Sequence, residues 1–298
     1  MREFEATPLD SERYYLGEGI RWDEVRSELA WVDIAPTRSR MFRANPQGGA
    51  LNIKQTYEFN EGFTVFAPLR SREQGWIAGY GDAIVHLKED GTTSPLNVIV
   101  TENPEVVRTN DGTADPWGGF WVGTMGRHAE SELGSLYWRH NGHVELMKSN
   151  CTISNGTSWS PDHRYMYFTD SALGTLYRAE VGPNGRPGDF VPFIVLPDPA
   201  SAAPDGHCVD ENGHLWVAIW GGREVREYSP SGELVGRVKV DAHQVSCCTL
   251  GGPNGTTLFI TTAQEGYSAQ DSANDPHAGK IFTCDVGVRG LPILCADL

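Results

Sequence analysis

Hydrophobic and aromatic residues gather in a short strand-like run that recurs six times along the chain. The six runs occupy residues 29–34, 75–80, 119–125, 165–170, 214–220 and 257–263, and they begin 43 to 49 residues apart. A second run follows each of them and ends at a polar or Gly-rich turn, as in GSLYWRHNG and REVREYSPSG. A period of about 40–50 residues with several short strands per unit is typical of a β-propeller, whose sheets must stack to bury their faces. We therefore predict an all-β fold, a six-bladed β-propeller that residues 1–298 form as a single domain.

One aromatic residue recurs in each of these runs. The set is Trp31, Trp76, Trp121, Tyr167, Trp216 and Phe259. Because the rings follow the repeat, we expect them to pack between sheets rather than to bind a ligand. Residues 3–8 are expected to complete a sheet made largely by the other end of the chain, since a ring of sheets must close its edges.

The composition argues against several classes of partner. Asp and Glu number 39 against 24 Lys and Arg, and the resulting net charge of −15 argues against binding to nucleic acid. No apolar run reaches the ~18 residues of a membrane-spanning helix, and the acidic start lacks the apolar core of a secretion signal. The six cysteines form no CxxC pair, so we interpret them as free thiols of a reducing compartment and expect a cytoplasmic protein.

Four oxygen-bearing side chains share one position within the repeat. Each lies 9 to 11 residues before a hydrophobic run and is followed by Gly or Asp-Gly: Glu18, Asn110, Asn155 and Asp205. The corresponding positions of the other two repeats, near Val65 and residues 246–247, are apolar or small. Asn-Gly and Asp-Gly also form turns, but Glu-Gly is not a favoured turn pair. We therefore expect a site for one divalent cation, with Ca, Mg, Mn, Zn and Fe(II) as candidates.

Five segments of the sequence carry a family resemblance. They read LGEGIRWDE, RTNDGTADPWGGFWVGTM, SNGTSWSPDHRYMYFTDS, PDGHCVDENGHLWVAIWGG and CCTLGGPNGTTLFITTA. In order and spacing they resemble the SMP-30/gluconolactonase/regucalcin family over nearly the whole chain. The resemblance implies a six-bladed propeller that holds one divalent ion. It also implies that the protein hydrolyses sugar-acid lactones. It also implies that Glu18, Asn155 and Asp205 hold the metal, and that Arg108 and Asn110 contact the substrate.

The function that we expect is metal-dependent hydrolysis of an aldono-1,4- or 1,5-lactone to the aldonic acid. The metal would polarise the lactone carbonyl, and Asp205 would act as the base that activates water. One alternative is a related propeller hydrolase that acts on phosphotriesters or apolar lactones. Another is a calcium-binding propeller without catalytic activity.

One loop departs from the family pattern. Animal members have acidic residues shortly after the GTM motif, whereas residues 126–130 here read GRHAE. Arg127 and His128 are placed to contact substrate hydroxyls or an anionic group, unless they belong to a solvated loop. We include His128 among the predicted substrate-binding residues, and we expect a different substrate preference.

Overall fold

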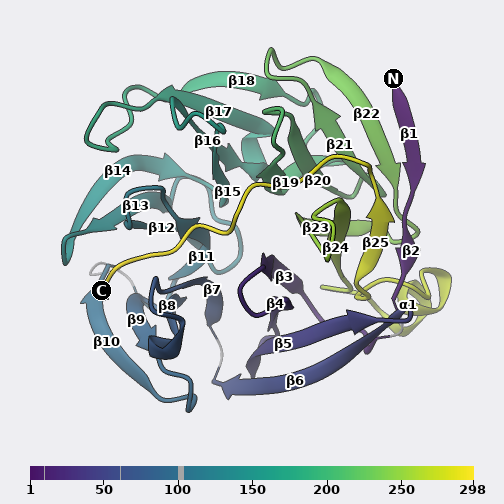
Figure 1. The fold of residues 1–298 in the computed structure, drawn as a ribbon, viewed down its shortest axis with the longest axis horizontal. Coiled ribbons are helices and arrows are strands. Elements are labelled where there is room, and N and C mark those ends of the chain that lie inside the picture. The colour runs from purple at the N-terminus through teal and green to yellow at the C-terminus, as the bar shows by residue number, and fades with distance from the viewer. Residues whose placement is uncertain (10, 61, 100–103) are drawn as a thin grey trace. The chain divides into compact units, whose positions relative to one another are not determined.

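Antiparallel β-strands make up almost all of the regular secondary structure, which confirms the all-β class (Figure 1). The computed structural model describes residues 1–9, 11–60, 62–99 and 104–298. The helices of these residues are α1 (Ala269–Asn274), η1 (Arg72–Gln74) and η2 (Ser171–Leu173), and none is long and apolar enough to cross a membrane. The chain divides into two compact units: unit 1 has residues 1–35, 40–57 and 196–293, and unit 2 has residues 36–39, 58–195 and 294–298.

Unit 2 contains three four-stranded sheets, in each of which the strands pair in chain order. The first sheet has β7 (Phe63–Pro68), β8 (Trp76–Tyr80), β9 (Ala83–Leu87) and β10 (Thr93–Val98). The second has β11 (Val107–Ala114), β12 (Phe120–Gly126), β13 (Gly134–His140) and β14 (His143–Cys151). The third has β15 (Ser154–Trp159), β16 (Tyr165–Asp170), β17 (Thr175–Glu180) and β18 (Val191–Val195). The first strand of each sheet is mostly buried, and the fourth is largely exposed. Packing on both faces therefore holds the first strands in place.

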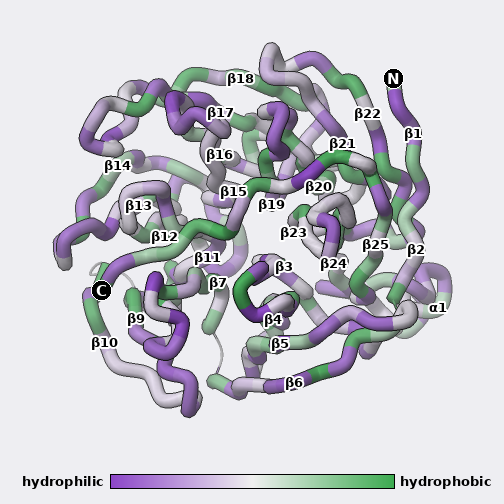
Figure 2. The backbone as a smooth tube through the Cα atoms, in the orientation of Figure 1, coloured by the Kyte–Doolittle hydropathy of each residue, from purple (hydrophilic) through white to green (hydrophobic). Residues whose placement is uncertain are grey.

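Unit 1 holds one four-stranded sheet and one nine-stranded sheet. The four-stranded sheet has β3 (Gly17–Asp23), β4 (Glu28–Ile34), β5 (Ser39–Gln47) and β6 (Ala50–Phe59). Hydrophobic and hydrophilic residues alternate along its outer strand β6, where green and purple follow each other in Figure 2. The nine-stranded sheet has β1 (Arg2–Glu5), β2 (Thr7–Pro8), β19 (Ala203–Val209), β20 (Leu215–Trp220), β21 (Glu224–Tyr228), β22 (Leu234–Lys239), β23 (Gln244–Gly251), β24 (Thr257–Ala263) and β25 (Phe282–Asp285).

The prediction of six separate blades, and with it the six-bladed propeller, is wrong. The described residues form four four-stranded sheets and one nine-stranded sheet. The fifth and sixth repeats share the larger sheet because Trp220, at the end of β20, pairs with Gln244, at the start of β23. The N-terminal segment adds a second link, since β1 pairs with β22 and β2 pairs with β25. The assignment of a single domain to residues 1–298 stays a prediction.

Packing of the repeated aromatic rings forms much of the core. All six rings predicted to pack there are at most 3% exposed: Trp31, Trp76, Trp121, Tyr167, Trp216 and Phe259. The expected role of the N-terminal segment is also confirmed, because Thr7 and Pro8 pair with Thr283 and Phe282 at the edge of β25. The repeat pattern therefore identified the core correctly even though it miscounted the sheets.

A buried aspartate fastens the turn that follows β11. Asp115 is 1% exposed, and its Oδ1 accepts the backbone N–H groups of Trp117 and Gly119, both at 2.8 Å. Its Oδ2 accepts the indole N–H groups of Trp121 at 3.0 Å and Trp138 at 2.7 Å. One carboxylate thus connects a turn to two indole rings of the core.

We expect Asp115→Ala to lower the free energy of unfolding by at least about 3 kcal/mol. The substitution leaves three buried N–H donors and the partly buried N–H of Trp117 without their acceptor, and each buried donor costs about 1–3 kcal/mol. Asp115→Asn keeps one carbonyl oxygen and should lose less. Urea denaturation measures both, with Asp162→Ala at an exposed turn as the control, for which we expect a loss below about 1 kcal/mol. Equal losses at positions 115 and 162 would contradict this role.

Candidate active site

A register slip interrupts the first strand of every repeat at the corresponding position. The pairing with the next strand skips residues between Glu18 and Arg21, Phe63 and Val65, Thr109 and Gly112, Asn155 and Thr157, Pro204 and His207, and Val245 and Cys247. Such β-bulges leave residues unpaired and redirect their side chains. The four oxygen-bearing residues singled out from the sequence all lie at these bulges. Their shared position in the repeat therefore reflects a shared irregularity of the backbone.

Unit 1 contributes the two carboxylates of the predicted metal site. Glu18 lies at the bulge of β3 and is 8% exposed, and Asp205 lies in the bulge of β19 and is 5% exposed. Strand β23 contacts both β3 and β19, so the two carboxylates come from the strands on either side of it. The Oε2 atom of Glu18 accepts the N–H of Gly19 at 2.8 Å. Burying two carboxylates is costly unless N–H groups or cations stabilise them, which makes this pair suited to a divalent cation.

Steric constraints explain why a glycine follows each of these two carboxylates. Gly19 has a φ of 56°, in the left-handed region that favours glycine. A Cβ atom at position 206 would lie 2.5 Å from the Sγ atom of Cys247 on the neighbouring strand β23. The Glu-Gly and Asp-Gly pairs in the sequence therefore mark bulged, closely packed strands rather than hairpin turns.

Unit 2 contributes Asn155, the third predicted metal ligand. Its side chain is almost buried, and its Nδ2 atom donates to the Oγ atom of Ser171 at 3.1 Å. This bond fixes the orientation of the amide, and its Oδ1 atom accepts the N–H of Gly156 at 3.3 Å. The amide oxygen is therefore directed along the bulge of β15, away from Ser171.

The two predicted substrate-binding residues of β11 lie in contact. Arg108 Nη1 donates to Asn110 Oδ1 and to the carbonyl oxygen of Thr109, both at 2.8 Å. Asn110 Nδ2 in turn donates to the carbonyl oxygen of Ser154 at 3.0 Å, one residue before Asn155. The structure thus joins Arg108, Asn110 and the start of β15 in one chain of hydrogen bonds within unit 2.

His128, the third predicted substrate-binding residue, lies in the exposed turn after β12. Its backbone N–H donates to the Oε2 atom of Glu130 at 3.0 Å. No hydrogen bond between its side chain and Arg108 or Asn110 occurs among the described residues. A role in substrate binding for His128 stays a prediction.

Two hydroxyl groups at the remaining bulges have roles that the sequence did not indicate. Thr64 occupies the bulge of β7, and its Oγ1 atom donates to Thr109 Oγ1 at 3.0 Å. Ser246 occupies the bulge of β23 and donates to the carbonyl oxygen of Gly17 at 2.5 Å. These hydroxyls tie neighbouring first strands together, so the two bulges without a carboxylate or amide have a structural role. The repeat was the signal for both: Thr64 lies one residue before Val65, and Ser246 was among the compared positions but was counted only as a small residue.

His207 follows Asp205 on β19 and is nearly buried. Burial lowers the pKa of His207 to about 4, so the imidazole is neutral at physiological pH. The neutral ring can donate one hydrogen bond and accept another, but it does not contribute a positive charge.

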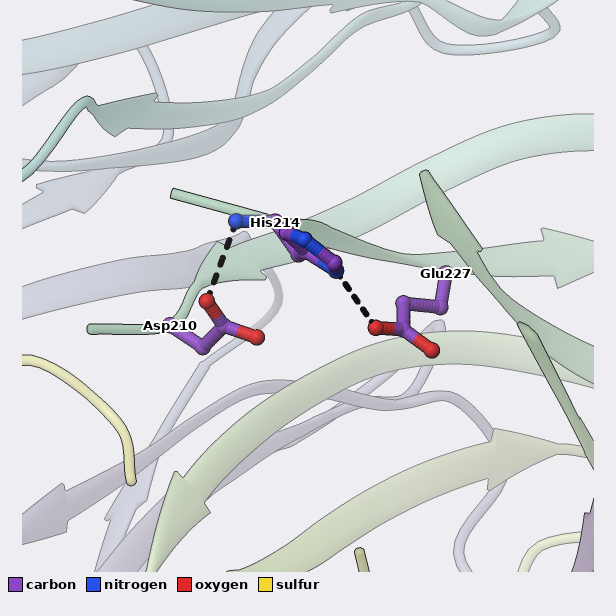
Figure 3. Close-up of side chains that lie close together, drawn as sticks. All are labelled: Asp210, His214 and Glu227. Carbon is purple, nitrogen blue, oxygen red and sulfur yellow. Dashed lines mark hydrogen bonds and ion pairs between the residues drawn. The ribbon is translucent and has the colours of Figure 1, made fainter. Parts of the chain in front are cut away.

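A second cluster of potential metal ligands lies elsewhere in unit 1 (Figure 3). The side chains of Asp210, His214 and Glu227 have ligand atoms within 4.8 Å of one another. His214 Nδ1 is 2.6 Å from Glu227 Oε1, and Glu227 also accepts hydrogen bonds from Arg2. Asp210 Oδ1 accepts the backbone N–H of His214 at 3.0 Å, and its Oδ2 accepts the indole N–H of Trp216 at 3.0 Å. The oxygens of this cluster are thus engaged by protein donors.

Comparison with the Asp115 turn identifies the cluster as structural. Asp210 accepts N–H groups two, four and six residues further along the chain, as Asp115 does. In unit 2, Gly119 stands at the place of His214, and Trp138 stands at the place of Glu227 opposite the repeated Trp. The same aspartate geometry therefore forms in a repeat that has no imidazole at this place.

Residues 16–264 match the model of the SMP-30/gluconolactonase/LRE-like region. The chain is 33% identical over 293 residues to an L-arabinolactonase of Azospirillum brasilense, with 96% of this chain and 94% of that protein covered. It is 31% identical over 287 residues to a 6-deoxy-6-sulfogluconolactonase of Pseudomonas putida, with 95% and 94% covered. Among solved structures, a calcium-binding protein, regucalcin, of Agrobacterium tumefaciens matches over 100% of both chains at 25% identity, with a TM-score of 0.89. The predicted family is thereby confirmed: the chain belongs to the SMP-30/gluconolactonase/LRE-like family.

Proposed function

We propose that this protein hydrolyses a sugar-acid lactone with one divalent metal ion, opening an aldono-1,4- or 1,5-lactone to the aldonic acid. The observation that carries the proposal is the set of carboxylate and amide groups at the bulges of buried first strands. Relatives named as lactonases, which match over nearly their whole length, support a lactone-hydrolysing enzyme. We further propose that residues 1–298 act as a single domain.

The chemistry of the donor set fits a hard divalent cation. Glu18 and Asp205 offer carboxylate oxygens whose two negative charges balance the cation, and Asn155 offers an amide oxygen. The hydrogen bond from Asn155 to Ser171 prevents the amide from rotating. Calcium heads the candidates, ahead of Mg, Mn, Zn and Fe(II), because the similar regucalcin structure is described as calcium-binding. When bound, the cation would polarise the lactone carbonyl as a Lewis acid.

Asp205 would supply the general base. A carboxylate has two oxygens, so one can serve as a ligand while the other accepts a proton from the attacking water. Its place in the bulge of a buried strand fixes the carboxylate before substrate arrives. Such preorganisation lowers the cost of reaching the transition state.

Arg108 and Asn110 would hold the sugar hydroxyls. Their mutual hydrogen bond orients both side chains, and the bond from Asn110 to Ser154 O anchors the pair. A hydrolase for phosphotriesters or apolar lactones would need an apolar surface here, and a calcium-binding protein without activity would need no such pair. The polar pair therefore favours a polyhydroxylated lactone.

We expect Glu18→Gln, Asn155→Ala and Asp205→Asn each to reduce the divalent metal retained after purification. Few protein ligands hold the ion, so the loss of one oxygen donor or one negative charge weakens binding strongly. Elemental analysis of dialysed protein measures the metal content. His214→Asn, in the structural cluster, serves as the matched control and should keep it. Full occupancy in all three variants, or loss only in the control, would assign the metal to other residues.

Asp205→Asn should also lower kcat by about 10²–10⁴-fold at saturating metal, because an amide oxygen still coordinates but does not accept the proton of water. Proton release from a sugar lactone in weak buffer gives the initial rates. Asp241→Asn, an exposed position of the same unit, is the control. A kcat near that of the unaltered protein would place the base on another residue.

Arg108→Ala should raise KM for a sugar lactone more than for an unsubstituted γ-lactone. A site built around hydrogen bonds loses discrimination when its donor is removed, and the unsubstituted ring offers no hydroxyls. Steady-state kinetics on both lactones test this, with the exposed Arg164→Ala as the control. Faster hydrolysis of a phosphotriester or a long-chain lactone by the unaltered protein would instead support the alternative hydrolase.

A further inference from the structure

A buried aspartate holds the start of strand β15, which carries Asn155. Asp170, the last residue of β16, is fully buried, and its Oδ2 and Oδ1 atoms accept the backbone N–H groups of Thr152 at 2.9 Å and Ile153 at 3.1 Å. The residue after it adds a third bond, because the N–H of Ser171 donates to the carbonyl oxygen of Ile153 at 3.1 Å. These hydrogen bonds fix the backbone two and three residues before Asn155.

The same arrangement occurs in the first repeat, ahead of Glu18. Asp33 is 2% exposed, and its Oδ1 atom accepts the N–H of Leu16 at 3.1 Å. The N–H of Ile34 donates to the carbonyl oxygen of Leu16 at 2.9 Å, which reproduces the third bond of the fourth repeat. In both repeats the aspartate lies 17 residues after the residue whose N–H its Oδ1 accepts. The N–H group that is bound belongs in each case to the residue two before a candidate ligand, Glu18 or Asn155.

These aspartates affect the ligands because the β-bulge follows each ligand directly. Asn155 pairs with Thr169, and the pairing of β15 is then interrupted. Glu18 pairs with Val32, and the pairing of β3 is interrupted in the same way. The contacts that directly fix each ligand are therefore those of the residues before it, where the aspartate binds. Hydrogen bonds to a charged carboxylate are roughly twice as strong as those between neutral groups, so a buried aspartate holds this backbone firmly.

The fourth repeat adds a direct contact with the candidate ligand. Ser171 is 6% exposed, and its Oγ atom accepts a hydrogen bond from Nδ2 of Asn155 at 3.1 Å. An amide has one donor end and one acceptor end, so a bond that holds the nitrogen also determines the direction of the oxygen. Ser171 thus contributes its backbone to the start of β15 and its hydroxyl to the amide.

We propose that Asp170, Ser171 and Asp33 are positioning residues of the divalent-metal site. The inference rests on the proposed function and deepens it, because it names residues that keep the ligands in place without touching the cation. Asp170 fixes the strand before Asn155, and Ser171 fixes the amide itself. Asp33 fixes the strand before Glu18. Replacement of residues that hold metal ligands typically weakens metal binding about 10- to 100-fold.

Equilibrium dialysis of the full chain tests these roles by measuring the dissociation constant of the candidate cation that the unaltered protein binds most tightly. Asp170→Asn places an amide NH2 against one of two N–H groups, and Asp33→Ala removes the acceptor of Leu16. We expect each to raise the dissociation constant about 10- to 100-fold. Ser171→Ala should raise it about 2- to 10-fold, the effect of losing one hydrogen bond between neutral groups. Ser171→Thr keeps the hydroxyl and should bind the cation as the unaltered protein does.

Asp115→Asn is the matched control, because Asp115 is also a buried carboxylate that accepts N–H groups, but its donors are not next to a candidate metal ligand. It should lower stability towards urea and keep the dissociation constant. An increase as large as that in Asp170→Asn would attribute the effect to general destabilisation and overturn the inference. Where Asp170→Asn does not fold, the comparison of Ser171→Ala with Ser171→Thr decides.

Two further results would overturn the inference while the metal site stood. One is an unchanged dissociation constant in Asp170→Asn and Ser171→Ala, and the other is an equal increase in Ser171→Ala and Ser171→Thr. Retention of none of the candidate cations by the unaltered protein would instead overturn the proposed metal site, and the inference with it.

Discussion

The β-bulge in the first strand of each repeat is the constraint on which the site depends. In a regular strand, a residue that pairs with its neighbour points to one of the two packed faces of the sheet. Glu18 pairs with Val32 directly before the slip of β3, and Asp205 lies inside the slip of β19, while the flanking pairs keep the backbone fixed. Each carboxylate is therefore held by sheet hydrogen bonds on both sides of the bulge. A candidate ligand set on rigid strands needs little reorganisation to bind a cation.

The core and the candidate ligands were accessible from the sequence because both follow the repeat. Trp31, Trp121 and Trp216 recur in one register, and each is fully buried. Glu18 and Asp205 were found because each lies 9 to 11 residues before a hydrophobic run and is followed by Gly. In both cases a local pattern follows from a steric requirement: a ring must pack tightly in the core, or a bulge leaves no room for a side chain, as at Gly206.

The remaining features arise from contacts between distant segments. The merging of the fifth and sixth repeats depends on the pairing of Trp220 with Gln244 and on the N-terminal strands, and neither leaves a periodic signal. The roles of the Thr64 and Ser246 hydroxyls were not foreseen because Ser and Thr occur in many environments, and each role depends on the strand beside the residue. The network around Glu227 joins β20, β21 and the N-terminal Arg2, so no single stretch of sequence contains it.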